Sequence, residues 1–209
     1  MAAGMYKLYH SPLSQHARRV VSLLESGGID YELVPIAVEK GAHMSPEYLA
    51  INPNHQLPAM EVGGEILLES NAIMRFLCDE HGLDSWYPKR TKARAKVDQW
   101  LDWNQCRLMD PTTSLVINKV MLGDKGDKDA IAKAESRLSD VLGVLEAHLD
   151  GREWVAGDGP TIADLSIASN IFQLGFAQAM PKTPHTSAWF SRVMELPGFQ
   201  ASLPPPPRE

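Results

Sequence analysis

The chain has 209 residues and a formal net charge of −6, with 44% hydrophobic and 22% charged residues. This length allows one large domain or two small ones, each with its own hydrophobic core. The composition is ordinary for a soluble globular protein. The acidic balance and the lack of a basic stripe argue against a general nucleic-acid binder, and no apolar run approaches the roughly 20 residues that span a bilayer.

Two further features bear on the cellular compartment. The opening residues lack a basic start followed by an apolar stretch, so we expect no secretory signal. The two cysteines, Cys78 and Cys106, lie far apart in helix-like sequence, which favours reduced core thiols over a disulfide. These features predict a cytoplasmic protein.

The first part of the chain predicts alternating strands and helices. Residues 5–10 alternate and are rich in aromatic side chains, as in a strand. Ser14 then precedes a helix that ends at Gly28. Residues 29–38 predict a second strand, and Ser45, followed by proline, is expected to cap a short helix.

A hairpin and a further helix follow. Residues 59–62 and 65–68 predict its two strands, because Gly63 and Gly64 supply the positive φ angles that a two-residue turn requires. Ser70 is expected to cap the next helix. The element order β-α-β-α-β-β-α predicts a mixed four-stranded sheet with helices, which is the thioredoxin topology.

The rest of the chain contains no convincing strand and predicts a helical bundle. Thr161 and Asp164 form a variant of the capping box at the start of one of these helices. We therefore expect an α/β plus all-α protein: a thioredoxin-like domain over 1–83, a linker over 84–91 and an all-helical domain over 92–209.

Pro58 stands at the beginning of a predicted strand, although it has no backbone N–H to donate. One interpretation is that it is simply the first residue of an edge strand. Alternatively, a cis Leu57–Pro58 bond would turn the Leu57 backbone outward to pair with an extended partner. The local sequence does not decide between these two interpretations, because cis bonds occur at only about 5–6% of such positions.

The order of these motifs resembles that of the cytosolic glutathione transferases. The similarity is tightest in YHSPLSQHARRV, GIDYELVPIAVEKGAHMSPEYLAINPNHQLPAM and LLESNAIMRFL, whereas the helical half matches only in its layout and in GPTIADLSIA. The pattern is most similar to the serine-type phi and theta branches, and we expect a bacterial-type member.

The resemblance implies a glutathione site at the end of the sheet. In the family, the proline that corresponds to Pro58 is cis, and the backbone before it pairs with the cysteinyl part of glutathione as an added strand. The resemblance implies these glutathione-binding residues: Ser14, His43, Met44, Gln56, Leu57, Pro58, Glu69 and Ser70.

The binding residues also have simpler interpretations. Ser70 could receive a glutathione carboxylate at a helix N-terminus while Glu69 faces the ammonium group, or they could be an N-cap and a solvated strand end. His43 matches the loop that holds the glycine end of glutathione in the family, but a lone loop histidine is usually solvated. Met44 replaces the lysine common in phi-like members, and Lys40 is a candidate substitute. Gln56 could bond the ligand backbone or finish the turn.

Ser14 aligns with the catalytic serine of the family because it stands four residues before Arg18, directly ahead of a helix. Ser11 is the competitor, but it lies too early in the sequence. A free thiol with a pKa near 8.5 is only about 3% thiolate at pH 7. A hydrogen bond to charged sulfur would lower the thiol pKa by about one to two units. Ser14 can cap the helix with a lone pair and donate its hydrogen to sulfur.

We therefore expect a detoxifying glutathione transferase that joins the glutathione thiolate to electrophilic, mostly apolar small molecules. Glutathione is the expected co-substrate, with no metal, and the resemblance implies a homodimer. A glutathione-dependent peroxidase or disulfide reductase, and a non-catalytic scaffold with the same fold, are the alternatives. The sequence has no C-x-x-C for a dithiol enzyme and no G-x-S-x-G for a serine hydrolase.

Overall fold

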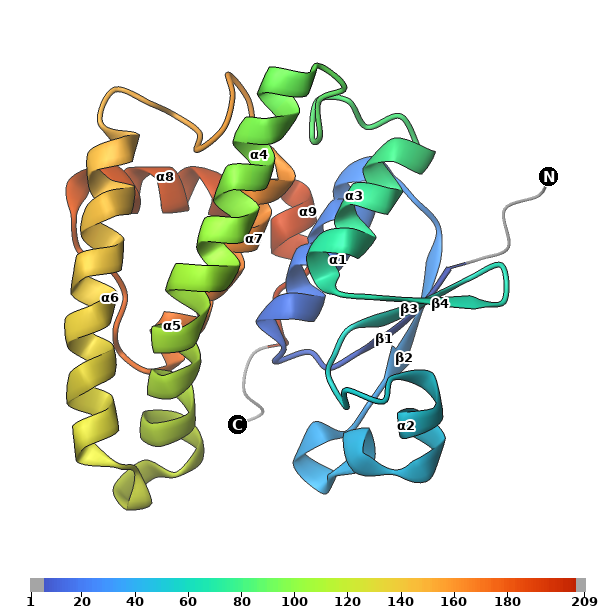
Figure 1. The fold of residues 1–209 in the computed structure, drawn as a ribbon, viewed down its shortest axis with the longest axis horizontal. Coiled ribbons are helices and arrows are strands. Elements are labelled where there is room, and N and C mark those ends of the chain that lie inside the picture. The colour runs from blue at the N-terminus through green and yellow to red at the C-terminus, as the bar shows by residue number, and fades with distance from the viewer. Residues whose placement is uncertain (1–5, 206–209) are drawn as a thin grey trace. The chain divides into compact units, whose positions relative to one another are not determined.

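The computed structural model describes residues 6–205 and divides into two compact units, which we treat separately (Figure 1). The first unit comprises Met1–Leu83 and Leu196–Glu209, and the second comprises Asp84–Glu195. The last segment of the chain therefore groups with the first unit.

The first unit contains a four-stranded mixed sheet with the strand order β2-β1-β3-β4. β1 pairs in parallel with β2 and antiparallel with β3, and β3 pairs antiparallel with β4. This arrangement confirms the expected thioredoxin-like topology. The strands are β1 (Tyr6–His10), β2 (Tyr31–Pro35), β3 (Ala59–Val62) and β4 (Glu65–Leu68).

The two faces of this sheet carry different side chains because successive residues of a strand point to opposite sides. Leu8 and Met60 are fully buried on one face. Tyr9 points to the other face, where its ring meets that of Tyr48 edge to face at a centroid distance of 6.4 Å. The helices of this unit are α1 (Gln15–Gly27), α2 (Pro46–Ile51), α3 (Ser70–Glu80) and α9 (Pro197–Ala201), with 3-10 turns at Val38–Lys40 and Ala42–Met44.

Side-chain caps explain where two of these helices, α1 and α2, begin. The Ser14 hydroxyl oxygen accepts a hydrogen bond from the Ala17 N–H at 3.2 Å, and Ser45 accepts one from the Tyr48 N–H at 3.3 Å. Both caps were expected from the sequence. The prediction that Ser70 is an N-cap is wrong, because Ser70 is the first residue of α3. Glu69 occupies the cap position and makes the turn with φ 66° and ψ 110°, without a side-chain capping bond.

The short helix α9 packs closely against α1. A Cβ atom at Gly198 would lie 2.2 Å from the Ser26 hydroxyl and 2.6 Å from the Ser22 carbonyl oxygen, so only glycine fits this position. The neighbouring Phe199 is fully buried. This contact attaches the end of the chain to the helix that Ser14 caps.

The second unit consists of helices joined by non-helical segments and, between Asp84 and Glu195, contains no strand. Pro111 lacks an N–H and its ring crowds the carbonyl four residues earlier, which accounts for a π-helical turn just before it.

Within residues 6–205, no helix is both long and apolar enough to cross a membrane. The elements are α4 (Thr91–Trp103), a π-helical segment (Asn104–Leu108), α5 (Met109–Leu115), a second π-helical segment (Val116–Met121), a 3-10 turn (Gly123–Lys125), α6 (Lys128–Leu149), α7 (Ile162–Phe176) and α8 (Pro184–Met194).

Paired polar groups lie in the core of this unit. The fully buried Asp164 carboxylate accepts four hydrogen bonds of 2.9–3.0 Å, from Val155 N–H, Trp189 Nε1, and both the N–H and the hydroxyl of Thr161. This confirms the expected pairing of Thr161 and Asp164 at the start of α7. Burial raises the pKa of Asp164, while these hydrogen bonds act in the opposite direction.

The two cysteines are both free thiols. Cys78 is buried, as expected, but Cys106 is exposed, so the prediction that both are core residues is wrong for Cys106. The reason is local geometry. Cys106 lies in the first π-helical segment, where Asn104 and Leu108 take the buried positions.

Candidate functional site

The predicted site residues lie on segments that leave one end of the sheet. His10, the last residue of β1, pairs with Pro35, the last residue of β2. Tyr9 pairs with Ala59, the first residue of β3, and Ala59 pairs with Leu68, the last residue of β4. The segments after β1, β2 and β4 and the segment before β3 therefore start from this end, which we call the loop end of the sheet.

Ser14 lies on the segment after β1 and is partly exposed. Its main-chain N–H donates to the Ser11 carbonyl at 3.0 Å, and its hydroxyl oxygen caps α1 through the Ala17 N–H. Within residues 6–205, no acceptor receives the Ser14 hydroxyl hydrogen. The hydroxyl therefore fills its capping role with a lone pair and keeps its hydrogen available for a ligand.

The first turn of α1, which Ser14 caps, has no acidic residue. Burial, with a smaller effect from Arg19, lowers the pKa of His16 to about 3, so this imidazole is neutral at pH 7. Burial also lowers the pKa of Arg18 and of Arg19, but guanidinium groups stay charged at neutral pH. The N-terminus of α1 carries a partial positive charge, which favours an anion near Ser14.

The segment before β3 presents Gln56, Leu57 and Pro58. Gln56 is exposed, and Leu57 is partly exposed. The Leu57–Pro58 peptide bond is cis, the form that the resemblance implies. The sequence analysis did not identify two residues that matter here. Tyr48 and Asn52 hold this segment by donating hydrogen bonds to the Gln56 carbonyl oxygen, several residues further along the chain.

Glu69 and Ser70 lie on the segment after β4. Glu69 is exposed and adopts a positive φ that non-glycine residues rarely take. Such a conformation costs roughly 1–3 kcal/mol and is concentrated at functional sites. Ser70 is buried in the first turn of α3, where the main-chain N–H groups lack partners within the helix.

His43 and Met44 lie on the segment after β2, in the second 3-10 turn. The His43 Nδ1 atom is buried and has no hydrogen-bond partner within residues 6–205. The Met44 side chain is 52% exposed and brings no charge to this segment. All the predicted site residues therefore lie on segments that connect to the loop end of the sheet.

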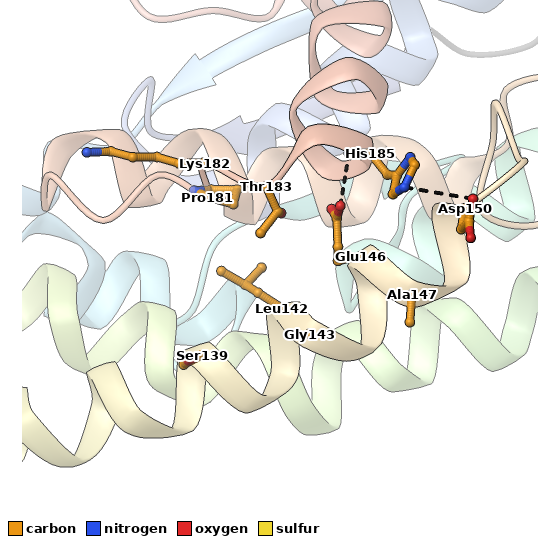
Figure 2. Close-up of a pocket in the computed structure, with 10 residues that line it drawn as sticks. All are labelled: Ser139, Leu142, Gly143, Glu146, Ala147, Asp150, Pro181, Lys182, Thr183 and His185. Carbon is orange, nitrogen blue, oxygen red and sulfur yellow. Dashed lines mark hydrogen bonds and ion pairs between the residues drawn. The ribbon is translucent and has the colours of Figure 1, made fainter.

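A separate groove of about 600 Å³ lies in the second unit, along α6 and the segment that leads into α8 (Figure 2). The Glu146 side chain points from α6 toward the first residues of α8, and its carboxylate accepts from the His185 N–H at 3.0 Å (Figure 2). It also accepts from the N–H and the hydroxyl of Thr186, each at 2.8 Å. None of the predicted site residues lines this groove. Across residues 6–205, no cluster of three or more His, Cys, Asp or Glu side chains could hold a metal ion.

The fold and the loop end of the sheet define a protein with a thioredoxin-like unit that offers donors and a helix N-terminus to an anionic ligand. Models of two domains match the sequence: the N-terminal domain of glutathione S-transferase over residues 4–79 and its C-terminal domain over residues 104–197. Together they cover most of the chain, so the protein belongs to the glutathione S-transferase family.

Known proteins similar to this chain agree with that assignment. Glutathione S-transferase 3 of Zea mays is 34% identical, and the alignment covers 96% of each chain. A probable glutathione S-transferase of Oryza sativa subsp. japonica, GSTF2, is also 34% identical over 96% of this chain and 98% of its own. The expectation of a bacterial-type member is not borne out, because these relatives come from plants.

Solved structures show the same similarity. Poplar glutathione transferase F1 matches with a TM-score of 0.88 at 28% identity, over 96% of this chain and 97% of that one. Glutathione S-transferase-I bound with the ligand lactoylglutathione matches with a TM-score of 0.83 at 31% identity, over 95% of this chain and 98% of that one.

Proposed function

We propose that the loop end of the sheet binds reduced glutathione and that Ser14 activates its thiol. The chain would then transfer the thiolate to electrophilic, mostly apolar small molecules. The observation that carries this proposal is the Ser14 hydroxyl, which caps α1 while its hydrogen has no acceptor within residues 6–205. A solved structure similar to this chain holds a glutathione derivative, which supports glutathione as the co-substrate.

The chemistry of Ser14 follows from its position. Its hydrogen would bond the glutathione sulfur, and a hydrogen bond to a charged group contributes about 1.5–3 kcal/mol. This corresponds to a thiol pKa lowered by about one to two units, since each unit is about 1.4 kcal/mol. The thiol releases its proton to water, the thiolate attacks the electrophilic carbon and the leaving group departs with the bonding electrons, while Ser14 keeps its own proton. Binding both reactants together supplies the remaining acceleration.

The other predicted residues would hold the peptide part of glutathione. The Leu57 backbone would pair with the cysteinyl residue, with Gln56 beside it. Glu69 would face the ammonium group, and the N-terminal turn of α3 at Ser70 would receive the neighbouring carboxylate. The positive φ of Glu69 supports this role, because strained backbone conformations are concentrated at functional sites.

His43 would act at the glycine end of glutathione, where its unpartnered Nδ1 supports a ligand contact. Met44 would contribute only apolar contact there. We further propose a homodimer located in the cytoplasm, with glutathione binding assigned to 1–83, a linker to 84–91 and the helical domain to 92–209, although α9 in this last range packs with the first unit.

Retention on immobilised glutathione, followed by conjugation of glutathione to chlorodinitrobenzene, tests the proposal. We expect the wild-type protein to be retained on immobilised glutathione and to catalyse the conjugation. Ser14→Ala should still be retained but lose about one to two orders of magnitude in turnover. Ser11→Ala is the matched control and should keep near-wild-type rates.

Three results would count against the proposal. A wild-type protein with neither retention nor turnover would favour the scaffold alternative. Retention with reduction of peroxides or disulfides, but no conjugation, would favour the peroxidase or reductase alternative. Loss of turnover in Ser11→Ala with normal rates in Ser14→Ala would transfer the catalytic role to Ser11.

A further inference from the structure

The carbonyl oxygen of Gln56 is held by two buried donors. The Tyr48 hydroxyl donates to it at 2.6 Å, and Asn52 Nδ2 donates to it at 2.9 Å. Tyr48 is only 3% exposed and Asn52 only 2%. A main-chain carbonyl that receives two side-chain donors from the protein interior has a fixed direction, although the Gln56 side chain itself is exposed.

Fixing this carbonyl also fixes the next N–H. The Gln56 carbonyl and the Leu57 N–H belong to one planar trans peptide unit, so they point in opposite directions. Because the carbonyl points toward Tyr48 and Asn52, the Leu57 N–H points away from them. Within residues 6–205, this N–H donates no hydrogen bond.

The two donors are themselves held in place. The Tyr48 ring packs edge to face against Tyr9 of β1, which ties it to the sheet. Burial raises the pKa of Tyr48 to about 12, so its hydroxyl remains a donor at neutral pH. The Asn52 side-chain oxygen accepts from the Asn54 N–H at 3.0 Å, which orients its amide group toward Gln56.

We propose that Tyr48 and Asn52 are positioning residues that present the Leu57 N–H to the main chain of a bound peptide. The acceptor would be the cysteinyl carbonyl oxygen of glutathione, so this inference rests on the proposed function. Neither residue touches the sulfur. Their effect is therefore on the affinity for the peptide part of the ligand and not on the state of the thiol.

Tyr48→Phe and Asn52→Ala test this role, with Tyr31→Phe as the matched control. Tyr48→Phe removes one hydroxyl and keeps the ring that packs against Tyr9. Tyr31→Phe removes a hydroxyl that donates to Glu25 at 2.6 Å on the surface of the same unit. The measurements are the dissociation constant of S-hexylglutathione by calorimetry, KM and kcat with glutathione, the pH profile of kcat/KM, and the melting temperature.

We expect each test variant to bind S-hexylglutathione about fivefold to tenfold more weakly, and KM for glutathione to rise by the same factor. The value of kcat at saturating glutathione should stay within about twofold, and the inflection of the pH profile should not move. A purely structural defect would lower kcat and the melting temperature together, without this separation of KM from kcat. Tyr31→Phe should match the wild type in affinity.

The outcomes separate this inference from the proposed function. If the wild-type protein binds neither ligand, the proposed function fails before any variant is compared. If the wild type binds and Tyr48→Phe binds equally well, the positioning role alone is overturned. Should Tyr48→Phe unfold at the assay temperature, Asn52→Ala decides by the same criteria.

Discussion

Three polar atoms at the loop end of the sheet and the side chains of Asp164 and Asn104 in the helical unit differ in their hydrogen-bond partners. The Ser14 hydroxyl hydrogen, His43 Nδ1 and the Leu57 N–H have no partner within residues 6–205. In the helical unit, Asp164 accepts four hydrogen bonds. Asn104 there donates to both oxygens of Ser166 and accepts from Asn170 at 2.8 Å.

This difference indicates that the residues at the loop end serve ligand binding, whereas the paired residues of the helical unit serve stability. Ser14 and Leu57 are partly exposed, so water can satisfy their polar groups until a ligand replaces it. A fully paired network instead stabilises its own unit and leaves little for a ligand. We therefore expect changes at the loop end to alter ligand affinity and turnover, and changes at Asp164 to alter stability.

The largest expected effect is that of Asp164→Ala. Removing the carboxylate leaves the buried donors of Val155, Thr161 and Trp189 unsatisfied, so the free energy of unfolding should fall by about 3–5 kcal/mol. Urea denaturation measures the change. Asp158→Ala, at an exposed position, is the control and should change stability by no more than about 0.5 kcal/mol. Equal stability of the two variants would show that the hydrogen bonds to Asp164 do not stabilise the helical unit.

Gly198→Ala tests the attachment of α9 to α1 in the first unit. The added Cβ would meet backbone atoms of Ser22 and Ser26, so the free energy of unfolding should fall by about 2 kcal/mol. Gly143→Ala in α6 is the matched control, because nothing lies within 4 Å of its added Cβ. That helix should gain roughly 0.5–1 kcal/mol. If both substitutions stabilise the protein, the close contact of α9 with α1 does not exist in solution.

Glu146→Gln should have a smaller and pH-dependent effect. Partial desolvation raises the pKa of Glu146, but hydrogen bonds from Thr186, His185 and Thr183 outweigh it and lower the pKa from 4.5 to about 2. A lowered carboxyl pKa in the folded state contributes stability above pH 4.5, and this contribution is lost as the pH falls toward 2. Because the group is largely solvated, we expect a loss of only about 1 kcal/mol at pH 7.

Thermal unfolding of both proteins across this pH range measures the Glu146 effect. The difference between wild type and Glu146→Gln should shrink steadily from pH 4.5 to 2. A difference that stays constant across the range would show that the carboxylate charge does not stabilise the start of α8.

Local sequence signals predicted much of the first unit. The Gly63-Gly64 turn was predictable because a tight hairpin requires positive φ at both positions, and the structure has φ 57° and 89° there. Ser14 was predictable as an N-cap because its hydroxyl bonds a backbone group only three residues away. In both cases the residue type and its nearest neighbours determine the conformation.

The features that were missed have no signal in the type of residue or in its immediate neighbours. The start of α3 depends on the positive φ of Glu69, which no property of glutamate favours. The return of α9 to α1 depends on Gly198 and Ser26, which are distant in sequence. The two donors to the Gln56 carbonyl come from residues four and eight positions earlier, and no single-sequence pattern reveals that they point to the same oxygen.

The state of the sulfur tests the central claim most directly. The pKa of the glutathione thiol bound to the wild-type protein and to Ser14→Ala can be read from the ultraviolet absorbance of the thiolate as the pH is varied. The account predicts a pKa about one to two units below that of a free thiol in the wild type, returning toward the free value in the variant. The same lowered pKa in both proteins would contradict it.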